Sequence, residues 1–128
     1  GRYYETMGQD DTMIAEYAKQ FVKGLQNIQS NGTWSGVLGS VKHFFGDGTT
    51  IFGADEGNAR VLNFKSYVNH NIQGYKGAIA SEVGSVMCSY SAINGIPQAI
   101  GGWMGNLLRN KLNFDGFIIS DYDEMRKY

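Results

Sequence analysis

The chain has 128 residues, of which 42% are hydrophobic and 18% are charged, a composition typical of one folded domain and unlike that of disordered chains. The formal net charge is −1, and because no run of like charges occurs, we expect neither a nucleic-acid partner nor an anionic lipid surface. No stretch approaches the roughly 18 consecutive apolar residues that a membrane-spanning helix needs.

Helices and strands alternate along the predicted chain. Three segments have apolar residues at three- and four-residue spacing, and three short apolar runs have the length of buried strands. In chain order we predict a helix over 11–26, a strand over 36–44, a helix over 63–80, a strand over 85–90, a helix over 103–112 and a strand over 116–120. Gly74 and Gly77 each lower the intrinsic propensity of the second helix by up to about 1 kcal/mol. The alternation predicts an α/β fold with a parallel sheet, because right-handed crossovers place each helix over a face of the sheet.

Polar, chemically capable side chains stand at the carboxyl end of each predicted strand. They are Lys42 and His43 on the first strand, Ser89 and Tyr90 on the second, and Ser120 and Asp121 on the third. Barrel and open-sheet α/β enzymes keep their sites at this edge of the sheet. We therefore expect a functional site there.

Four motifs, spread over nearly the whole chain, give the pattern a more specific meaning. They are GRYYE at 1–5, KHFFGDGTT at 42–50, VMCSYSAING at 86–95 and FDGFIISDY at 114–122. In order and spacing they resemble landmark motifs of glycoside hydrolase family 3. The resemblance implies part of a (β/α)8 TIM-like barrel, in a retaining enzyme that cleaves β-glucosidic bonds at terminal non-reducing glucose without a cofactor. Its partner would be a β-linked oligosaccharide or glucoside.

By this resemblance, Asp121 is the catalytic nucleophile that forms a covalent glycosyl-aspartate. A carboxylate at the end of an apolar strand is rigidly aimed, and a retaining glycosidase needs such a group facing an acid about 5 to 5.5 Å away. The other interpretation of Asp121 is a helix N-cap, with Glu124 three residues on completing a capping arrangement.

The resemblance also assigns Lys42, His43 and Arg2 to the hydroxyls of the sugar in the cleavage subsite, as hydrogen-bond donors. Without the resemblance, Lys42 and His43 are interpreted as a surface lysine beside a core histidine. Adjacent residues on a strand point to opposite faces, so only one of the pair should reach a ligand unless the strand has ended or bulged.

Further polar and aromatic residues have both a functional and a structural interpretation. Tyr122 follows the nucleophile, where it either stacks on the next sugar or packs as an ordinary aromatic. Tyr90 either bonds near the nucleophile or is a satisfied core tyrosine. Asp47, Asp55 and Glu56 lie in a glycine-rich loop; their structural interpretation is an Asx-turn or a solvated charge, which we favour for the last two.

The chain is too short for a complete barrel, which takes about 250 residues. We expect it to need the rest of its own chain, with the general acid/base in a second domain after the barrel. Hexosaminidases of the family resemble Lys-His-Phe-Pro-Gly-His-Gly, whereas Phe45 and Asp47 replace the proline and second histidine here. That difference favours the glucosidase branch.

Two alternative functions stay open at this point. One is a Schiff-base aldolase with Lys42 as the covalent residue, and the other is a catalytically silent sugar-binding or structural relative. Metal catalysis is poorly supported, because His43 and His70 are the only histidines and no His-Glu-x-x-His pattern occurs. We therefore predict no metal site.

Two features bear on cellular compartment. Cys88 is the single cysteine, and its apolar neighbours indicate a buried, unreactive thiol. Asn31 begins a glycosylation sequon, which would be used in a secreted or vacuolar eukaryotic protein. The compartment stays open.

Overall fold

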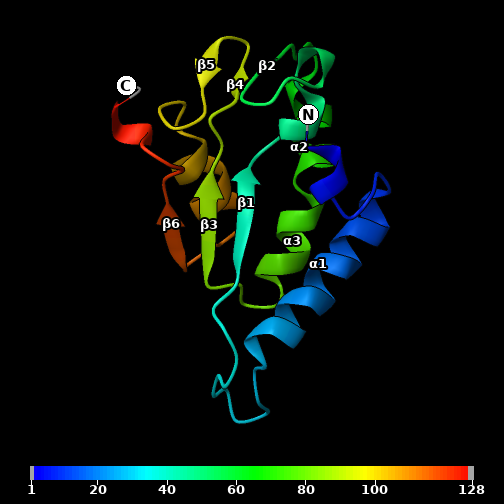
Figure 1. Cartoon of the computed structure of the whole chain (residues 1–128), viewed down its shortest axis with the longest axis vertical. Coiled ribbons are helices and arrows are strands. Elements are labelled where there is room, and N and C mark those ends of the chain that lie inside the picture. The colour runs from blue at the N-terminus through cyan, green and yellow to red at the C-terminus, as the bar shows by residue number, and fades with distance from the viewer. Residues whose placement is uncertain (1, 127–128) are drawn as a thin grey trace.

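A three-stranded parallel sheet forms the centre of the computed structural model, which describes residues 2–126. The strands are β1 (Ser40–Phe44), β3 (Ser85–Cys88) and β6 (Phe117–Ile119). They are ordered β1-β3-β6, so their carboxyl ends meet at one edge (Figure 1). The predicted α/β fold with a parallel sheet is confirmed.

The strand expected over 36–44 begins only at Ser40. The N–H groups of Gly36 and Val37 donate to the carbonyls of Gln26 and Leu25, at 3.1 and 2.9 Å. This segment is therefore hydrogen-bonded to the end of the first helix instead of to the sheet. The two other strands are likewise shorter than predicted.

Helix α1 (Asp11–Gln26) has the predicted bounds. Asp10 precedes it, and its side chain accepts a hydrogen bond of 2.8 Å from Met13 N, which satisfies one of the unpaired N–H groups of the first turn. Asn27 ends the helix in the left-handed conformation, at φ 45°. Local capping chemistry thus sets both ends.

The helix expected over 63–80 is two helices, α2 (Phe64–Asn71) and α3 (Gln73–Ile79). They are separated at Ile72, whose φ of −101° and ψ of 0° depart from regular helix geometry. Gly77 lies where α3 crosses α1: an added Cβ would come 2.0 Å from the backbone oxygen of Ala15. The glycine that lowers helix propensity is the residue that lets the two helices approach.

The last of the three predicted helices, expected as an α-helix over 103–112, is a π-helix over Met104–Lys111. Its end is tied to the entrance of β6, because Arg109 Nη1 donates to the carbonyls of Phe114 and Gly116 at 2.8 and 2.7 Å. Leu107 and Leu108 are both buried from this helix. The wide turn therefore places neighbouring leucines in one core.

A second, smaller sheet was not predicted. It comprises β2 (Asn58–Ala59), β4 (Ala92–Ile93) and β5 (Ile96–Pro97), in the order β2-β4-β5. An Asn94-Gly95 turn with positive φ at both residues joins β4 to β5. The sheet lies beyond the carboxyl ends of β1 and β3 (Figure 1), which places it next to the expected site.

The core lies between the parallel sheet and its helices. Helix α3 packs between β1 and α1 (Figure 1), and buried side chains include Phe44, Phe45, Val86 and Leu108. The apolar stripe of α1 is wider than its buried face, because Tyr17 and Phe21 stay exposed. Among residues 2–126, no helix is long and apolar enough to cross a membrane.

Candidate active site

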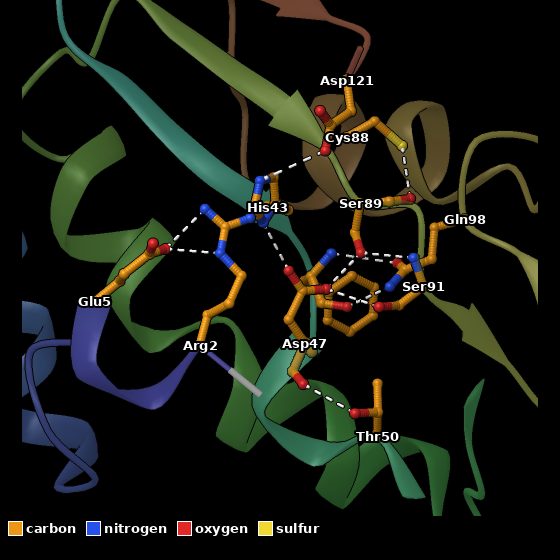
Figure 2. A network of polar contacts seen from close by, with 12 residues as sticks. Arg2, Glu5, His43, Asp47, Thr50, Cys88, Ser89, Ser91, Gln98 and Asp121 are labelled. Carbon is orange, nitrogen blue, oxygen red and sulfur yellow. Dashed lines mark hydrogen bonds and ion pairs between the residues drawn. The ribbon is translucent and has the colours of Figure 1, made fainter. Parts of the chain in front are cut away.

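The side chains of His43 and Asp121 meet at the carboxyl edge of the sheet. Nε2 of His43, in β1, lies 3.5 Å from Oδ2 of Asp121, which follows β6 (Figure 2). Ser89 follows β3 between them and is almost completely buried. Residues from three strands are thus brought together where the sequence placed the candidate site.

Lys42 and His43 both line one cavity, of about 410 Å³, which Arg2 and Asp47 also line. Adjacent residues of a regular strand would face opposite sides. The register between β1 and β3 shifts between Val41 and Phe44, however, which is the irregularity needed to bring both side chains to one side. The Lys42–His43 and Phe44–Phe45 peptide bonds in this stretch are cis.

Asp47 forms a dense set of hydrogen bonds and is not a solvated loop charge. Its Oδ2 lies 2.8 Å from Nδ1 of His43, and its Oδ1 accepts from the hydroxyls of Ser89 and Ser91 at 2.5 and 3.0 Å. Burial alone would raise the pKa of Asp47, but the hydrogen bonds from these three residues outweigh it and lower the pKa below its ordinary value. The carboxylate is therefore held in its charged form.

The two oxygens of Asp121 have different surroundings. Oδ1 accepts a hydrogen bond of 2.6 Å from Tyr122 N, whereas Oδ2 is directed at His43. Glu124 reaches back to Asp121 N at 3.3 Å, which resembles the expected capping arrangement. The short helix, however, begins at Glu124, so the side chain of Asp121 does not cap it. One oxygen is fixed by the turn and the other faces the site.

A smaller cavity, of about 20 Å³, lies against Asp121. It shares Arg2, His43, Asp47 and Asp55 with the larger cavity. The sequence favours loop structure for Asp55 and gives no sign that this residue lines both cavities. These four residues therefore form the boundary between the larger cavity and the candidate nucleophile.

The other predicted site residues lie at different distances from this centre. Arg2 is turned toward Glu5, with Nη2 and Nε both 2.8 Å from Glu5 Oε2 (Figure 2). Tyr90 and Glu56 line the smaller cavity. Tyr122 is 88% exposed and lines neither cavity among the described residues. The geometry thus gathers Arg2 and Tyr90 near Asp121 and leaves Tyr122 outward.

Two residues that sequence reasoning missed hold the segment that carries His43. Tyr75 Oη donates to the carbonyl of His43 at 2.5 Å. The side-chain amide of the buried Gln98 accepts from Phe45 N at 3.2 Å and donates to the Phe45 carbonyl. Both partners come from distant elements, so no local pattern signals them. They fix the backbone on either side of Phe44.

Cys88 lies beneath this site and has the buried position expected from the sequence. Burial, reinforced by the nearby carboxylate of Glu124, raises the pKa of its thiol to about 12. Within residues 2–126, no group of three or more His, Cys, Asp or Glu side chains is arranged to hold a metal ion.

Comparison with known proteins gives a family match over the full sequence. The chain matches the family described as "Glycosyl hydrolase family 3 N terminal domain" over residues 1–128. It is 33% identical to β-D-xylosidase 1 of Arabidopsis thaliana over 98% of this chain and 16% of the relative. It is 30% identical to β-glucosidase 2 of Saccharomycopsis fibuligera over 95% of this chain and 15% of the relative.

The fold is also similar to that of solved structures. The exo-1,3/1,4-β-glucanase of a Pseudoalteromonas species superposes with a TM-score of 0.86 at 35% identity, covering 94% of this chain and 15% of that one. The chain thus spans less than a fifth of the length of all three proteins. The similarity therefore covers only one part of each of these longer proteins.

Proposed function

The chain belongs to glycosyl hydrolase family 3, and from this we propose that it is the nucleophile-bearing part of a longer, retaining glycoside hydrolase that acts on β-glycosides. Relatives named β-xylosidase and β-glucosidase support the substrate class. Family membership favours glycoside cleavage over the alternative function, a Schiff-base aldolase with Lys42 as its covalent residue.

One observation carries the proposal: Asp121 has one oxygen bound by Tyr122 N and the other directed at His43. An anchored carboxylate keeps its free oxygen aimed, as attack on an anomeric carbon requires. In the proposed mechanism Asp121 forms a covalent bond to that carbon as the leaving group departs. Water then releases the sugar with retained configuration.

The cationic and imidazole groups around Asp121 would bind the sugar. Lys42 and His43 line a common cavity, and Arg2 lines both this cavity and the one beside Asp121. The lysine and arginine donate to ring hydroxyls, and such hydrogen bonds strengthen as charge develops in an oxocarbenium-like transition state. We assign these three residues to the terminal sugar, which we propose is glucose, and the exposed face of Tyr122 to the next unit.

The general acid/base is assigned to a carboxylate outside this chain. Asp47, the nearest carboxylate to His43, has both oxygens engaged by protein donors, so it is poorly suited to protonate a leaving group. The relatives are far longer than this chain. We therefore infer that the acid/base comes from a second domain of the longer enzyme.

The test is Asp121→Asn in the full-length enzyme. Asparagine keeps the shape of the side chain and an oxygen for Tyr122 N, but it is not a nucleophile. We expect kcat for an aryl β-glucoside to fall on the order of 10³-fold or more, and a 2-fluoroglucoside no longer to label the peptide containing residue 121. Binding of free glucose, measured by calorimetry, should change little. Normal turnover with normal labelling of another residue would end the assignment.

A parallel assay tests the terminal sugar. The wild-type enzyme should hydrolyse an aryl β-glucoside with a higher kcat/KM than the matching β-xyloside, which lacks only the hydroxymethyl group. A preference for the xyloside would leave the nucleophile assignment intact and overturn the assignment of glucose.

A further inference from the structure

We propose that Asp47 is a positioning residue: with Ser89 and Ser91, it keeps a proton of His43 on Nδ1 and thereby presents Nε2 to Asp121 and the substrate. The inference concerns the same site as the proposed function, and its catalytic consequence rests on that function. The orientation of the His43 ring does not depend on that function.

The distances determine which nitrogen carries the proton. Nδ1 of His43 lies 2.8 Å from Oδ2 of Asp47, and Nε2 lies 3.5 Å from Oδ2 of Asp121 (Figure 2). An ionised carboxylate only accepts hydrogen bonds, so the shorter contact requires a proton on Nδ1. In the neutral ring, Nε2 then carries the lone pair.

Asp47 is itself oriented by two serines. The backbone N–H of Ser91 donates to the hydroxyl oxygen of Ser89 at 2.9 Å. That hydroxyl directs its own proton to Oδ1 of Asp47, to which Ser91 Oγ also donates. Because Oδ1 is held by the two serines and Oδ2 is directed at Nδ1 of His43, we assign Asp47 the role of orienting His43. It is therefore a positioning residue in the sense that carboxylates behind metal-bound histidines are.

The imidazole has little freedom to turn. Its side chain is 11% exposed, and the carbonyl of His43 is held by Tyr75 Oη. Rotating the ring by half a turn about Cβ–Cγ would put Cδ2 in the place of Nδ1 at Asp47 and Cε1 in the place of Nε2 at Asp121, so both contacts would be lost. The contact with Asp47 therefore selects one orientation as well as one tautomer.

This orientation has a consequence for sugar binding. With its proton on Nδ1, a neutral His43 offers a lone pair at Nε2, beside the acceptor oxygen Oδ2 of Asp121. Two acceptors at this separation can share one donor, and a sugar hydroxyl is such a donor. Asp47 would thus make the pair complementary to a hydroxyl of the bound sugar.

The test reads the ring nitrogens directly. In the full-length enzyme labelled with ¹⁵N-histidine, long-range ¹H–¹⁵N spectra near neutral pH separate the two tautomers, with His43→Gln to assign the signals. We expect a proton on Nδ1 in the wild type. In Asp47→Asn, the amide can donate to Nδ1, so the population shifts toward the tautomer protonated on Nε2. The kcat/KM should fall roughly 10- to 100-fold, as for other carboxylates that orient a histidine.

The chain offers a matched control at the other histidine. Nδ1 of His70 lies 2.8 Å from Asp11, in an exposed pair between α1 and α2. Asp11→Asn makes the same chemical change at a residue that lines neither cavity, and kcat/KM should stay within about twofold of the wild type. An equal loss in both variants would mean a general effect on folding and would overturn the proposal.

The wild-type spectrum decides the tautomer even if Asp47→Asn does not fold. A proton on Nε2 and none on Nδ1 in the wild type would overturn the proposal, as would an Asp47→Asn enzyme with unchanged tautomer and unchanged kcat/KM. The two proposals fail separately. If Asp121→Asn remains active while Nδ1 of His43 is protonated, the nucleophile assignment is wrong and the orientation of His43 by Asp47 stands.

Discussion

His43 Nε2 and Asp121 Oδ2 lie 3.5 Å apart although their strands do not pair with each other. Strands β1 and β6 flank β3, so the two side chains meet over the end of the middle strand. The residue at that end is Ser89, which is small enough to lie beneath them and donates its hydroxyl to Asp47. The site therefore depends on the order of the three strands.

The first prediction concerns the stability of Asp47 variants in acid. Hydrogen bonds from His43, Ser89 and Ser91 outweigh the effect of burial, so the folded pKa of Asp47 lies below its ordinary value of 3.8. The ionised side chain therefore stabilises the fold above that value, and this stabilisation is lost as the pH falls through the folded pKa.

In thermal unfolding, the Tm advantage of the wild type over Asp47→Asn should be constant between about pH 5 and pH 7 and should shrink below about pH 4. Ser91→Ala removes one donor, which raises the pKa of Asp47 and starts the loss at higher pH. A difference that grows as the pH falls would contradict this account.

The second prediction concerns the reactivity of Cys88. Its thiol is buried, with a pKa of about 12, so roughly 10⁻⁴ of it is ionised at pH 8. We expect iodoacetamide to leave Cys88 unmodified in the native enzyme and to modify it fully in denaturant, as measured by peptide mass spectrometry. Native labelling at the rate of a free thiol would show that the side chain is accessible.

The third prediction compares two glycine-to-alanine changes in helices. At Gly77 the new Cβ would lie 2.0 Å from Ala15 O, a backbone atom that cannot move aside easily. Gly77→Ala should therefore destabilise the fold by about 1–3 kcal/mol. At Gly24, in α1, nothing lies within 4 Å of the added Cβ. Gly24→Ala should stabilise the fold by up to about 1 kcal/mol, because alanine is the better helix former.

Denaturant unfolding of the two variants beside the wild type measures both effects. The opposite signs are the informative result, since helix propensity alone predicts stabilisation at both positions. Stabilisation by Gly77→Ala would mean that α1 and α3 do not approach as closely as described.

The fourth prediction concerns the 128-residue chain expressed alone. Within the described residues, β1 and β6 each pair only with β3, and Phe117 of β6 is 70% exposed. Unpaired strand edges and exposed apolar side chains favour association and weaken folding. We expect the isolated chain to bind a hydrophobic dye and to show no turnover of an aryl β-glucoside. A folded, active monomer would refute this, with the full-length enzyme as the positive control.

Local chemistry explains where sequence reasoning succeeded. The bounds of α1 follow from its apolar spacing and from Asp10, both of which are visible within a few residues. The edge that carries the site follows from polar residues at the ends of apolar runs. The late start of β1 could not be predicted in this way, because the backbone of residues 36–37 bonds to the end of α1. The break at Ile72 lies within a continuous apolar spacing that gives no sign of it.

The environment of Asp47 shows the same difference within the site. The sequence motif places Asp47 in a glycine-rich loop, four residues after His43. Its other partners, Ser89 and Ser91, follow β3, more than 40 residues later in the chain. Nothing near Asp47 in the sequence signals them. The alternation of serines around Tyr90 was the available clue, because side chains two apart in an extended segment face the same side.

The amide of Gln98 has a further implication. It is completely buried just after β5 and grips both backbone groups of Phe45, two residues from His43 and two from Asp47. A displacement of the β4–β5 hairpin would consequently be transmitted to the histidine and its carboxylate together. Substitutions or loop-length changes in that hairpin therefore offer a way to alter the proposed active site remotely, while each proposed sugar-binding group remains the same.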